Sequence, residues 1–562
     1  MTDPVLVEPQ IGHLHTYFVF PFSIDRELVL ARHSHIWKNR LWIEGLDDWI
    51  QAHHGLNEIS RRLGPWKRAS HISFDADSRA YQNMVFFHPI VRRIYFDYGS
   101  SGDRMSLLRR YEIEGPPDFR LQLYAADVRG RDAAVDVSKL RLYLFANGIG
   151  LLAIGVEAFH RPASQALWIN EMMRKIYPSS GRQRREGRIP SLMRLTLQHE
   201  GETHLLVEET FQTCHLRAFQ PPLSALITSL LYFLDYGMQE YEPVLDERMI
   251  VYTYLAIDPQ GLPRGWCGSP AHEQLVSRVL YVDRWGSGYR YDPDFIRKQL
   301  DRHLYRRWAH QGTYYGFTSY SNITVTFGEF DCGDHELREG FLVHRMFDSR
   351  HYVMLLIALF YRATLLEFAE RVALVSRRLY LDLEDNRLSP ESVEFANRLR
   401  SDFLTFYNYW HFDEVANKDE ESEHFMKQCE GFNVFPMLEH TDHEVVRMSS
   451  TLSEYYQARS GEAVNRLAMI SMILGAGAVF TGYFGMNFAE DFARTFFEPA
   501  GSRTAHWLAI AAVSVFSLAA IGFGVFVVFA NWSDYKDVLL PRRARTPRLQ
   551  SLRKVDDEFP LD

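Results

Sequence analysis

Two long uncharged stretches near the C-terminus dominate the pattern of hydrophobic and polar positions along the chain. No Asp, Glu, Lys or Arg occurs from Leu467 to Ala489 or from Thr504 to Ser533. A helix rises about 1.5 Å per residue, so each stretch is long enough to cross a hydrocarbon core of about 30 Å. Backbone polar groups must be satisfied inside a segment that crosses a bilayer. The pattern therefore predicts two transmembrane helices, over about 467–484 and 505–532.

A helical periodicity leads into the first of these stretches. Apolar residues recur there every three or four positions, at Val445, Met448, Leu452 and Tyr455. Such a stripe predicts a face for partner helices. We expect one long helix over Thr441–Tyr483, because an isolated helical Gly such as Gly461 costs only about 1 kcal/mol. The alternative is two helices broken at Gly461.

The first 340 residues have a different pattern, in which runs that favour strands alternate with segments that favour helices. This mixture predicts an α+β sheet domain. The clearest strand pair spans Leu140 to Phe159, with Asn147-Gly148 at its turn. The other runs that favour strands are Tyr17–Phe20 (stopped by Pro21), Arg93–Tyr98, Thr203–Glu208, Met249–Ile257 and Thr313–Phe327. The segments that favour helices are Gln165–Ile176 and Pro222–Tyr236.

Residues 341–440 read as a helical region. The stretch from Phe341 to Tyr380 contains no Pro or Gly, and its part Tyr352–Tyr361 is strongly apolar. That part is too short to span a bilayer, so we expect a buried helix. Ser389 followed by Pro390 predicts the start of another helix.

Composition and motifs narrow the class of protein. The net charge of −9 over 562 residues argues against a nucleic-acid binder. Four cysteines are far apart, which indicates a reducing compartment and neither a disulfide framework nor a zinc ribbon. The first residues do not have the pattern of a signal peptide. No Walker phosphate loop, HExxH or GxSxG motif occurs, so the sequence predicts no enzyme.

The tripeptide Gly485-Met486-Asn487 lies at the end of the first uncharged stretch, after Tyr483-Phe484 and before Phe488. This arrangement resembles the CorA-type family of divalent-cation channels, whose signature Tyr-Gly-Met-Asn lies between two C-terminal membrane helices. The chain departs from the family pattern in three ways. Phe484 stands directly before the Gly, the usual mid-helix Pro is missing, and Ala478 stands where a Thr is common. The N-terminal domain is also longer than the minimal family version.

The resemblance implies a CorA-like fold and a membrane channel or transporter for divalent metal cations, with Mg²⁺ first and Co²⁺, Ni²⁺ or Zn²⁺ as other candidates. It implies a homopentamer in membrane lipid, in which Gly485, Met486 and Asn487 form the selectivity filter. No cofactor besides the transported ion is expected. Helical spacing back from Asn487 gives the pore-lining candidates Thr481, Ala478, Gly475, Ser471 and Leu467. Glu490, Asp491 and Glu498 either attract cations outside the pore or are ordinary surface.

The distribution of basic residues predicts the topology. The tail after the second helix is rich in Lys and Arg, whereas the loop from Gly485 to Arg503 holds only Arg494 and Arg503. By the positive-inside rule both termini are cytoplasmic and the loop is external. The expected location is the cell (inner) membrane.

The expected order is an α/β cytoplasmic domain (1–340), a cytoplasmic helical region (341–440), a stalk with the first membrane helix (441–484), the external loop (485–504), the second membrane helix (505–532) and a basic tail (533–562). Within the helical region, Asp413–Glu423 is acidic. It is either solvated surface or, as in the family, a place where carboxylates bind regulatory Mg²⁺; the individual ligands stay open. The alternative function is a membrane-tethered sensing or scaffold protein without transport.

Overall fold

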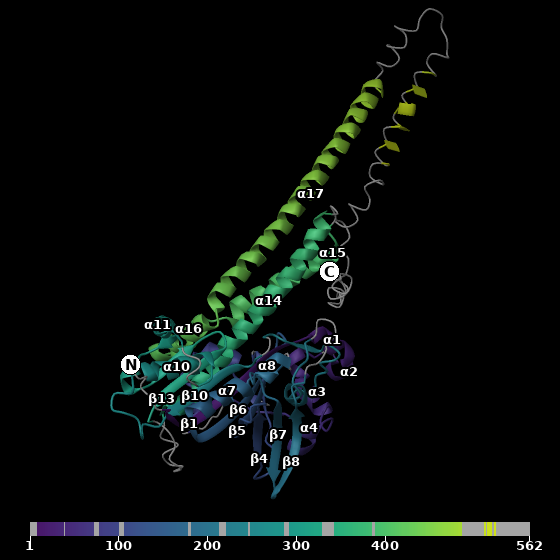
Figure 1. Cartoon of the computed structure of the whole chain (residues 1–562). Coiled ribbons are helices and arrows are strands. Elements are labelled where there is room, and N and C mark those ends of the chain that lie inside the picture. Colours follow the sequence, from purple (N-terminus) through teal and green to yellow (C-terminus); the bar gives the residue numbers. More distant parts are fainter. Residues whose placement is uncertain are drawn as a thin grey trace, which may run out of the picture. The chain divides into compact units, whose positions relative to one another are not determined.

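The structure is a computed structural model of the whole chain (Figure 1). It describes residues 8–38, 40–71, 78–99, 106–177, 181–212, 221–245, 248–285, 291–328, 342–384 and 388–485, and scattered positions between 508 and 526. These residues divide into two compact units, and most of the fold belongs to the first, which lies within Met1–Arg377 and Arg398–Glu444. The second lies within Arg378–Asn397 and Val445–Ser551.

Among the described residues, thirteen strands of the first unit form one sheet. In spatial order its main path is β11 (Leu304–Tyr305), β12 (Tyr314–Phe317), β13 (Ser321–Phe327), β10 (Ile250–Ile257), β1 (Gln10–Ile24), β6 (Ile149–Pro162), β5 (Asp132–Phe145), β4 (Arg120–Ala126), β7 (Leu192–His199) and β8 (Glu202–Glu209). Three short strands join it from the side, β2 (Lys67–Arg68), β3 (Leu108–Glu112) and β9 (Tyr241–Pro243). β10 and β13 run parallel, and the other pairs are antiparallel.

The helices of the described residues fall into two groups by sequence. The first group precedes the last strand: α1 (Arg26–Arg32), α2 (Ser34–Trp37), η1 (Trp42–Glu44), α3 (Leu46–Ala52), α4 (Glu58–Leu63), α5 (Arg79–Met84), α6 (Pro89–Tyr95), α7 (Ala163–Met173), α8 (Gly181–Arg185), α9 (Ala225–Leu230), α10 (Pro270–Tyr281), α11 (Pro293–His303) and η3 (Ala309–Gln311). The second group follows it: α13 (Leu342–Met346), the π-helix η4 (Phe347–His351), α14 (Tyr352–Glu384), α15 (Pro390–Thr405), the π-helix η5 (Phe406–Trp410), α16 (Asp419–Gly431) and α17 (Val434–Gly485).

Strand β1 is the centre of the sheet and is buried on both faces. Its even-numbered side chains, such as Leu14 and Phe18, belong to the hydrophobic core. On this face the Thr16 hydroxyl donates to Asn170 of α7 at 2.8 Å. Its odd-numbered side chains meet the second group of helices, where the ring of Tyr17 lies 4.6 Å from that of Tyr352 in α14. Both faces are thus covered by helices, so almost every residue of the strand is buried.

The α14 helix is the expected buried helix. Every residue from Tyr352 to Tyr361 is buried except Val353, and Phe360 stacks on Phe145 of β5 with ring centroids 4.3 Å apart. Among the described residues, Val343–Glu384 is the one helical stretch long and apolar enough to cross a membrane, and 78% of its most apolar part is buried in the protein. That burial is typical of a core helix, as the sequence predicted.

Several predicted elements are confirmed. Asn147-Gly148 turns β5 into β6, and Gly148 has φ +100°, which favours glycine. The predicted strands at Thr203–Glu208 and Met249–Ile257 are β8 and β10, and Thr313–Phe327 forms the hairpin β12–β13. Ser389 caps α15, since its hydroxyl accepts from the Ser392 backbone N–H at 3.1 Å.

Three expectations are wrong. Pro21 does not end a short run, because β1 continues through it to Ile24. The pairing of β1 with β10 stops at Val19 and that with β9 begins at Phe22, so a residue without an N–H is tolerated between them. The run Arg93–Tyr98 is not a strand, because Pro89 starts the helix α6 just before it. The expected helix over Pro222–Tyr236 is limited to the short α9.

The long helix α17 is continuous over 52 residues, from Val434 to Gly485 (Figure 1). It begins seven residues before the expected Thr441, and Gly461 does not break it. Within the described residues, nothing lies within 4 Å of the position that a Cβ on Gly461 would occupy. Packing among the described residues therefore does not require a glycine here, and one helix is the correct alternative.

The stacking of Phe360 on Phe145 makes a testable prediction. Phe360→Ala removes a fully buried ring and should destabilise the first unit by about 3–5 kcal/mol. Its thermal unfolding midpoint, followed by circular dichroism in detergent, should fall by several degrees. Tyr380→Ala, on the exposed part of the same helix, is the control and should leave the midpoint nearly unchanged. Equal midpoints for both variants would contradict this account of the core.

Candidate metal centre

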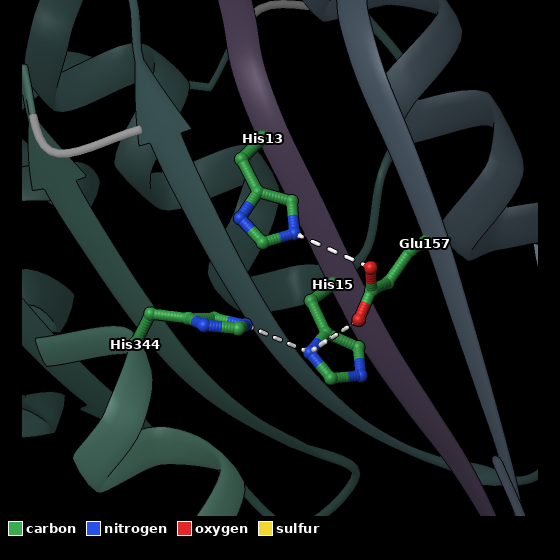
Figure 2. Close-up of side chains that lie close together, drawn as sticks. All are labelled: His13, His15, Glu157 and His344. Carbon is green, nitrogen blue, oxygen red and sulfur yellow. Dashed lines mark hydrogen bonds and ion pairs between the residues drawn. The ribbon is translucent and has the colours of Figure 1, made fainter. Parts of the chain in front are cut away.

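Three histidines and one glutamate meet on the face of the sheet that the second group of helices covers (Figure 2). His13 and His15 come from β1, Glu157 from the neighbouring β6, and His344 from α13. One potential ligand atom of each residue lies within 4.8 Å of those of the other three. All four residues belong to the first unit.

Strand geometry explains why three of them are neighbours. Side chains two residues apart on a strand point to the same face, so His13 and His15 share one side of β1. The antiparallel register of β1 and β6 places Glu157 directly opposite His15. Residues that are directly opposite in a sheet have neighbouring side chains on one face. His344 joins them from a helix far away in the sequence.

His15 and Glu157 are the two residues that connect the four side chains, because each lies close to two of the others. His15 Nδ1 lies 2.9 Å from His344 Nε2 and 3.5 Å from Glu157 Oε1. The second carboxylate oxygen, Oε2, lies 4.0 Å from His13 Nε2. Figure 2 shows the three rings and the carboxylate converging on one region.

The site is almost closed to solvent. The side chains of His13 and His15 are 2% and 1% exposed, and that of Glu157 is 17% exposed. Burial lowers the pKa of His15 well below its ordinary value; nearby Asp348 opposes this effect and His344 adds to it. His15 is therefore neutral at physiological pH, which is the form of imidazole that binds metals.

Neighbouring side chains hold the rings in place. Ser138 Oγ lies 3.3 Å from His15 Nε2, the nitrogen that faces away from the cluster. Phe159 stacks on His13 with centroids 4.5 Å apart, and Tyr254 presents its ring edge-on to His344 at 4.9 Å. A hydrogen bond to the outer nitrogen of a histidine fixes its tautomer and orientation. The Ser138 contact thus orients His15, and stacking on Phe159 orients His13.

An ion network lies beside the cluster, one helical turn after His344. Asp348 of η4 accepts a hydrogen bond from the Tyr17 hydroxyl and pairs with Lys139 at 2.8 Å. Arg141 lies 3.8 Å from the same carboxylate. Burial raises the pKa of Asp348, but Arg141 and Lys139 outweigh it and hold that pKa well below its usual range. The network ties the start of the helical layer to strands β1 and β5.

The donor set of the cluster determines what it can bind. Three imidazoles and one carboxylate are the ligands of Zn²⁺ and related transition ions, whereas Mg²⁺ prefers oxygen ligands alone. Ligand atoms around tetrahedral Zn²⁺ are about 3.3 Å apart, given metal–ligand distances of about 2.0–2.1 Å. Three of the observed separations, 2.9, 3.5 and 4.0 Å, bracket that value, and one potential ligand atom of each residue lies within 4.8 Å of those of the others.

The residues expected to form the pore lie elsewhere. Gly485 is the last residue of α17, and the helix also carries the five pore-lining candidates Leu467, Ser471, Gly475, Ala478 and Thr481. The remaining predicted residues, Met486, Asn487, Glu490, Asp491 and Glu498, lie outside the described residues, as does most of the second uncharged stretch.

The acidic segment Asp413–Glu423 makes contacts within the chain. Glu421 is buried and pairs with Arg350 at 3.1 Å. Glu420 accepts from the Trp308 indole at 2.6 Å, and Glu423 pairs with Arg307 at 3.1 Å. Glu420 and Glu423 therefore connect α16 to the sheet domain and Glu421 connects it to η4, roles that neither sequence interpretation included.

Sequence reasoning missed the four-residue cluster because the 23 histidines look scattered. One signal was present, since His13 and His15 alternate with apolar residues and so share a strand face. Predicting Glu157 as a member of the cluster requires the register of β1 against β6. Predicting His344 requires knowing how a helix more than 300 residues away packs on the sheet. Neither can be read from local pattern.

No protein-family model matches the chain, and neither a curated protein nor a solved structure does. The site must therefore be interpreted from its own chemistry.

A second histidine pair lies outside this cluster and predicts a pH dependence. His351 of η4 stacks on His424 of α16 with centroids 4.0 Å apart, close to Arg350, its partner Glu421, and the ring of Tyr315. Burial lowers the pKa of His351 well below its ordinary value and lowers the pKa of His424 to about 3, and in both cases the Arg350 charge adds to the effect.

Because these folded-state pKa values are lowered, the unfolded chain takes up protons first as the pH falls below about 6.5. Stability should therefore decrease from pH 7 to pH 5, by up to about 1.4 kcal/mol per pH unit for each histidine. His424→Gln should flatten the pH dependence of the thermal midpoint, whereas the exposed His35→Gln should not. An unchanged slope in His424→Gln would show that the pair does not titrate on unfolding.

Proposed function

We propose that the protein is a CorA-type membrane channel or transporter for divalent metal cations, with Mg²⁺ as the main ion. The observation that carries this proposal is the end of α17. A helix of 52 residues, about 78 Å long, becomes uncharged from Leu467 onward and reaches Gly485, where the Gly-Met-Asn tripeptide begins. A plain membrane anchor does not require such a motif at its end.

The exposure of the pore-lining candidates supports the proposal. At about 100° per residue, Leu467, Ser471, Gly475, Ala478 and Thr481 lie on one face of α17. The first four are exposed within this chain, and Thr481 donates its hydroxyl to the Gly477 carbonyl of its own helix at 2.9 Å. A face of small and weakly polar residues is suited to close packing of identical helices around a pore. We therefore propose a homo-oligomer, which the resemblance to the CorA-type family makes a pentamer.

The proposed filter works on the hydrated ion. Mg²⁺ loses its water reluctantly, and bound water presents hydrogen atoms that need acceptors. A ring of Asn487 amide oxygens supplies such acceptors without the charge that would trap the ion. Gly485 permits backbone conformations closed to other residues. Glu490, Asp491 and Glu498 would then raise the cation concentration outside the pore.

The topology follows from the charges on the two sides of the second uncharged stretch. The basic tail beyond it would be cytoplasmic, together with the sheet domain, and the loop after Asn487 would be external. A membrane-tethered sensing or scaffold protein would have the same anchor and topology. Measurement of ion flux separates the two functions.

The filter is tested by substitution at Asn487. Asn487→Ala should abolish or strongly reduce Mg²⁺ uptake into proteoliposomes, because a methyl group cannot accept hydrogen bonds from the water around the ion. Asn487→Asp keeps the size and the acceptors but adds a ring of negative charge, so it should slow release and change the selectivity among divalent ions. Size-exclusion chromatography should show that both variants assemble normally.

The matched control is Asn531→Ala, an amide at the far end of the second uncharged stretch, which should carry Mg²⁺ like the parent. If both Asn487 variants assemble and carry Mg²⁺ like the parent, Gly485-Met486-Asn487 is not the filter, and the channel proposal loses its main support. If Asn487→Ala only loses stability while flux is kept, Asn487 caps the helix.

The oligomeric state is a separate prediction. Two membrane helices per chain cannot enclose a pore, so the protein should be a homo-oligomer. By resemblance to the CorA-type family, native mass spectrometry in detergent should show a pentamer as the main species. Gly475→Leu places a large side chain on the proposed pore-lining face and should weaken assembly or block flux. A preparation that contains only monomers or dimers while still transporting Mg²⁺ would contradict this prediction.

A further inference from the structure

We propose that His13, His15, His344 and Glu157 bind one transition-metal ion of the Zn²⁺ class inside the sheet domain. The bound ion would connect helix α13 to strands β1 and β6. This site shares no residue with the proposed filter, so the proposal stands or falls independently of transport.

The chemistry of the ligands selects the class of ion. Neutral imidazole binds Zn²⁺, Co²⁺ and Ni²⁺ well, and a single carboxylate completes a four-coordinate set. Mg²⁺ requires near-octahedral oxygen coordination and retains several waters. A nearly closed cluster with one carboxylate does not offer those ligands. The site should therefore discriminate strongly against the ion that the pore is proposed to carry.

The geometry needs little adjustment to bind. Three ligands lie on paired strands whose backbone register fixes them, His13, His15 and Glu157. The fourth, His344, already lies 2.9 Å from His15 Nδ1. The two nitrogens at this distance would each turn a lone pair toward the ion, and the Glu157 carboxylate would move toward His13 from its present 4.0 Å. When His15 binds through Nδ1, its Nε2–H is free to donate to Ser138 Oγ, 3.3 Å away.

The position of His344 gives the ion a structural consequence. α13 leads directly into η4 and then into the buried α14. The next turn after His344 is already tied to the sheet by Asp348 through Tyr17 and Lys139. A metal bond at His344 would extend this attachment by one turn toward the start of the helical layer. Binding should thus raise the thermal stability of the first unit.

The test uses the full-length protein, purified in detergent without metal and titrated with Co²⁺. Four-coordinate Co²⁺ bound by imidazole has intense visible absorption, so the band reports on coordination and not on transport. We expect one equivalent per chain, displaced by Zn²⁺ and unaffected by a large excess of Mg²⁺. The thermal midpoint should rise on addition of Zn²⁺.

The substitutions are chosen to remove a ligand without disturbing the fold. His344→Gln changes a partly exposed side chain, and Glu157→Gln keeps the size of the carboxylate while removing its charge. Each should weaken Co²⁺ binding by more than about 100-fold, since the loss of a mere outer-shell partner already costs about 10–100-fold. Ser138→Ala should fall within that smaller range. The exposed His35→Gln is the matched control and should bind like the parent.

Each outcome decides the proposal. Binding that persists unchanged in His344→Gln and Glu157→Gln, while circular dichroism shows both folded, overturns it. The absence of a stoichiometric band in the parent also overturns it. Asn487→Ala should keep the Co²⁺ band, because the filter is a separate site. A protein that binds Co²⁺ here but transports no ion would refute the function proposed above and leave this site standing.

Discussion

Strand β1 is buried on both faces, and the rest of the first unit depends on that constraint. One face packs on α7 and the core, mainly through apolar side chains such as Leu14 and Phe18. The other face carries His13, His15 and Tyr17, polar groups that cannot be left without partners away from water. The helical layer of α13, η4 and α14 supplies those partners. The polar face of a central strand thus decides which helix packs there and in what register.

The charges beneath that layer are compatible with burial only because they are paired. Asp348 is held ionised by Lys139 and Arg141, and it accepts from Tyr17. Removing one partner of such a buried network leaves an uncompensated charge, which is strongly destabilising. The histidine cluster one turn away is also buried, but its burial does not depend on paired charges in the same way. Burial lowers the pKa of His15 and keeps its ring neutral, and a neutral imidazole can bind a metal ion.

Local pattern predicted much of the fold, and the errors have physical reasons. Asn147-Gly148 specified the β5–β6 turn because few other residues adopt its backbone conformation, and Tyr352–Tyr361 was recognised as a core helix from its length. The expected strand end at Pro21 was wrong because β1 tolerates a proline between the residues that pair with β10 and those that pair with β9. Where those partner strands end is tertiary information. The metal cluster depends on strand register and on His344, whose partner His15 lies 329 positions away. The filter was inferred from a motif and remains a prediction.

The two proposed sites would handle divalent ions by opposite means, and coordination chemistry keeps them separate. A neutral amide ring recognises an ion through its water and must release it quickly, so weak binding is an advantage at Asn487. A cluster of three imidazoles and a carboxylate replaces the water and holds the ion. Mg²⁺ is suited to the first and poorly to the second. On these two proposals, the sheet domain would keep Zn²⁺ bound while Mg²⁺ passes through the proposed pore, because a high concentration of Mg²⁺ does not overcome the preference of imidazole for Zn²⁺.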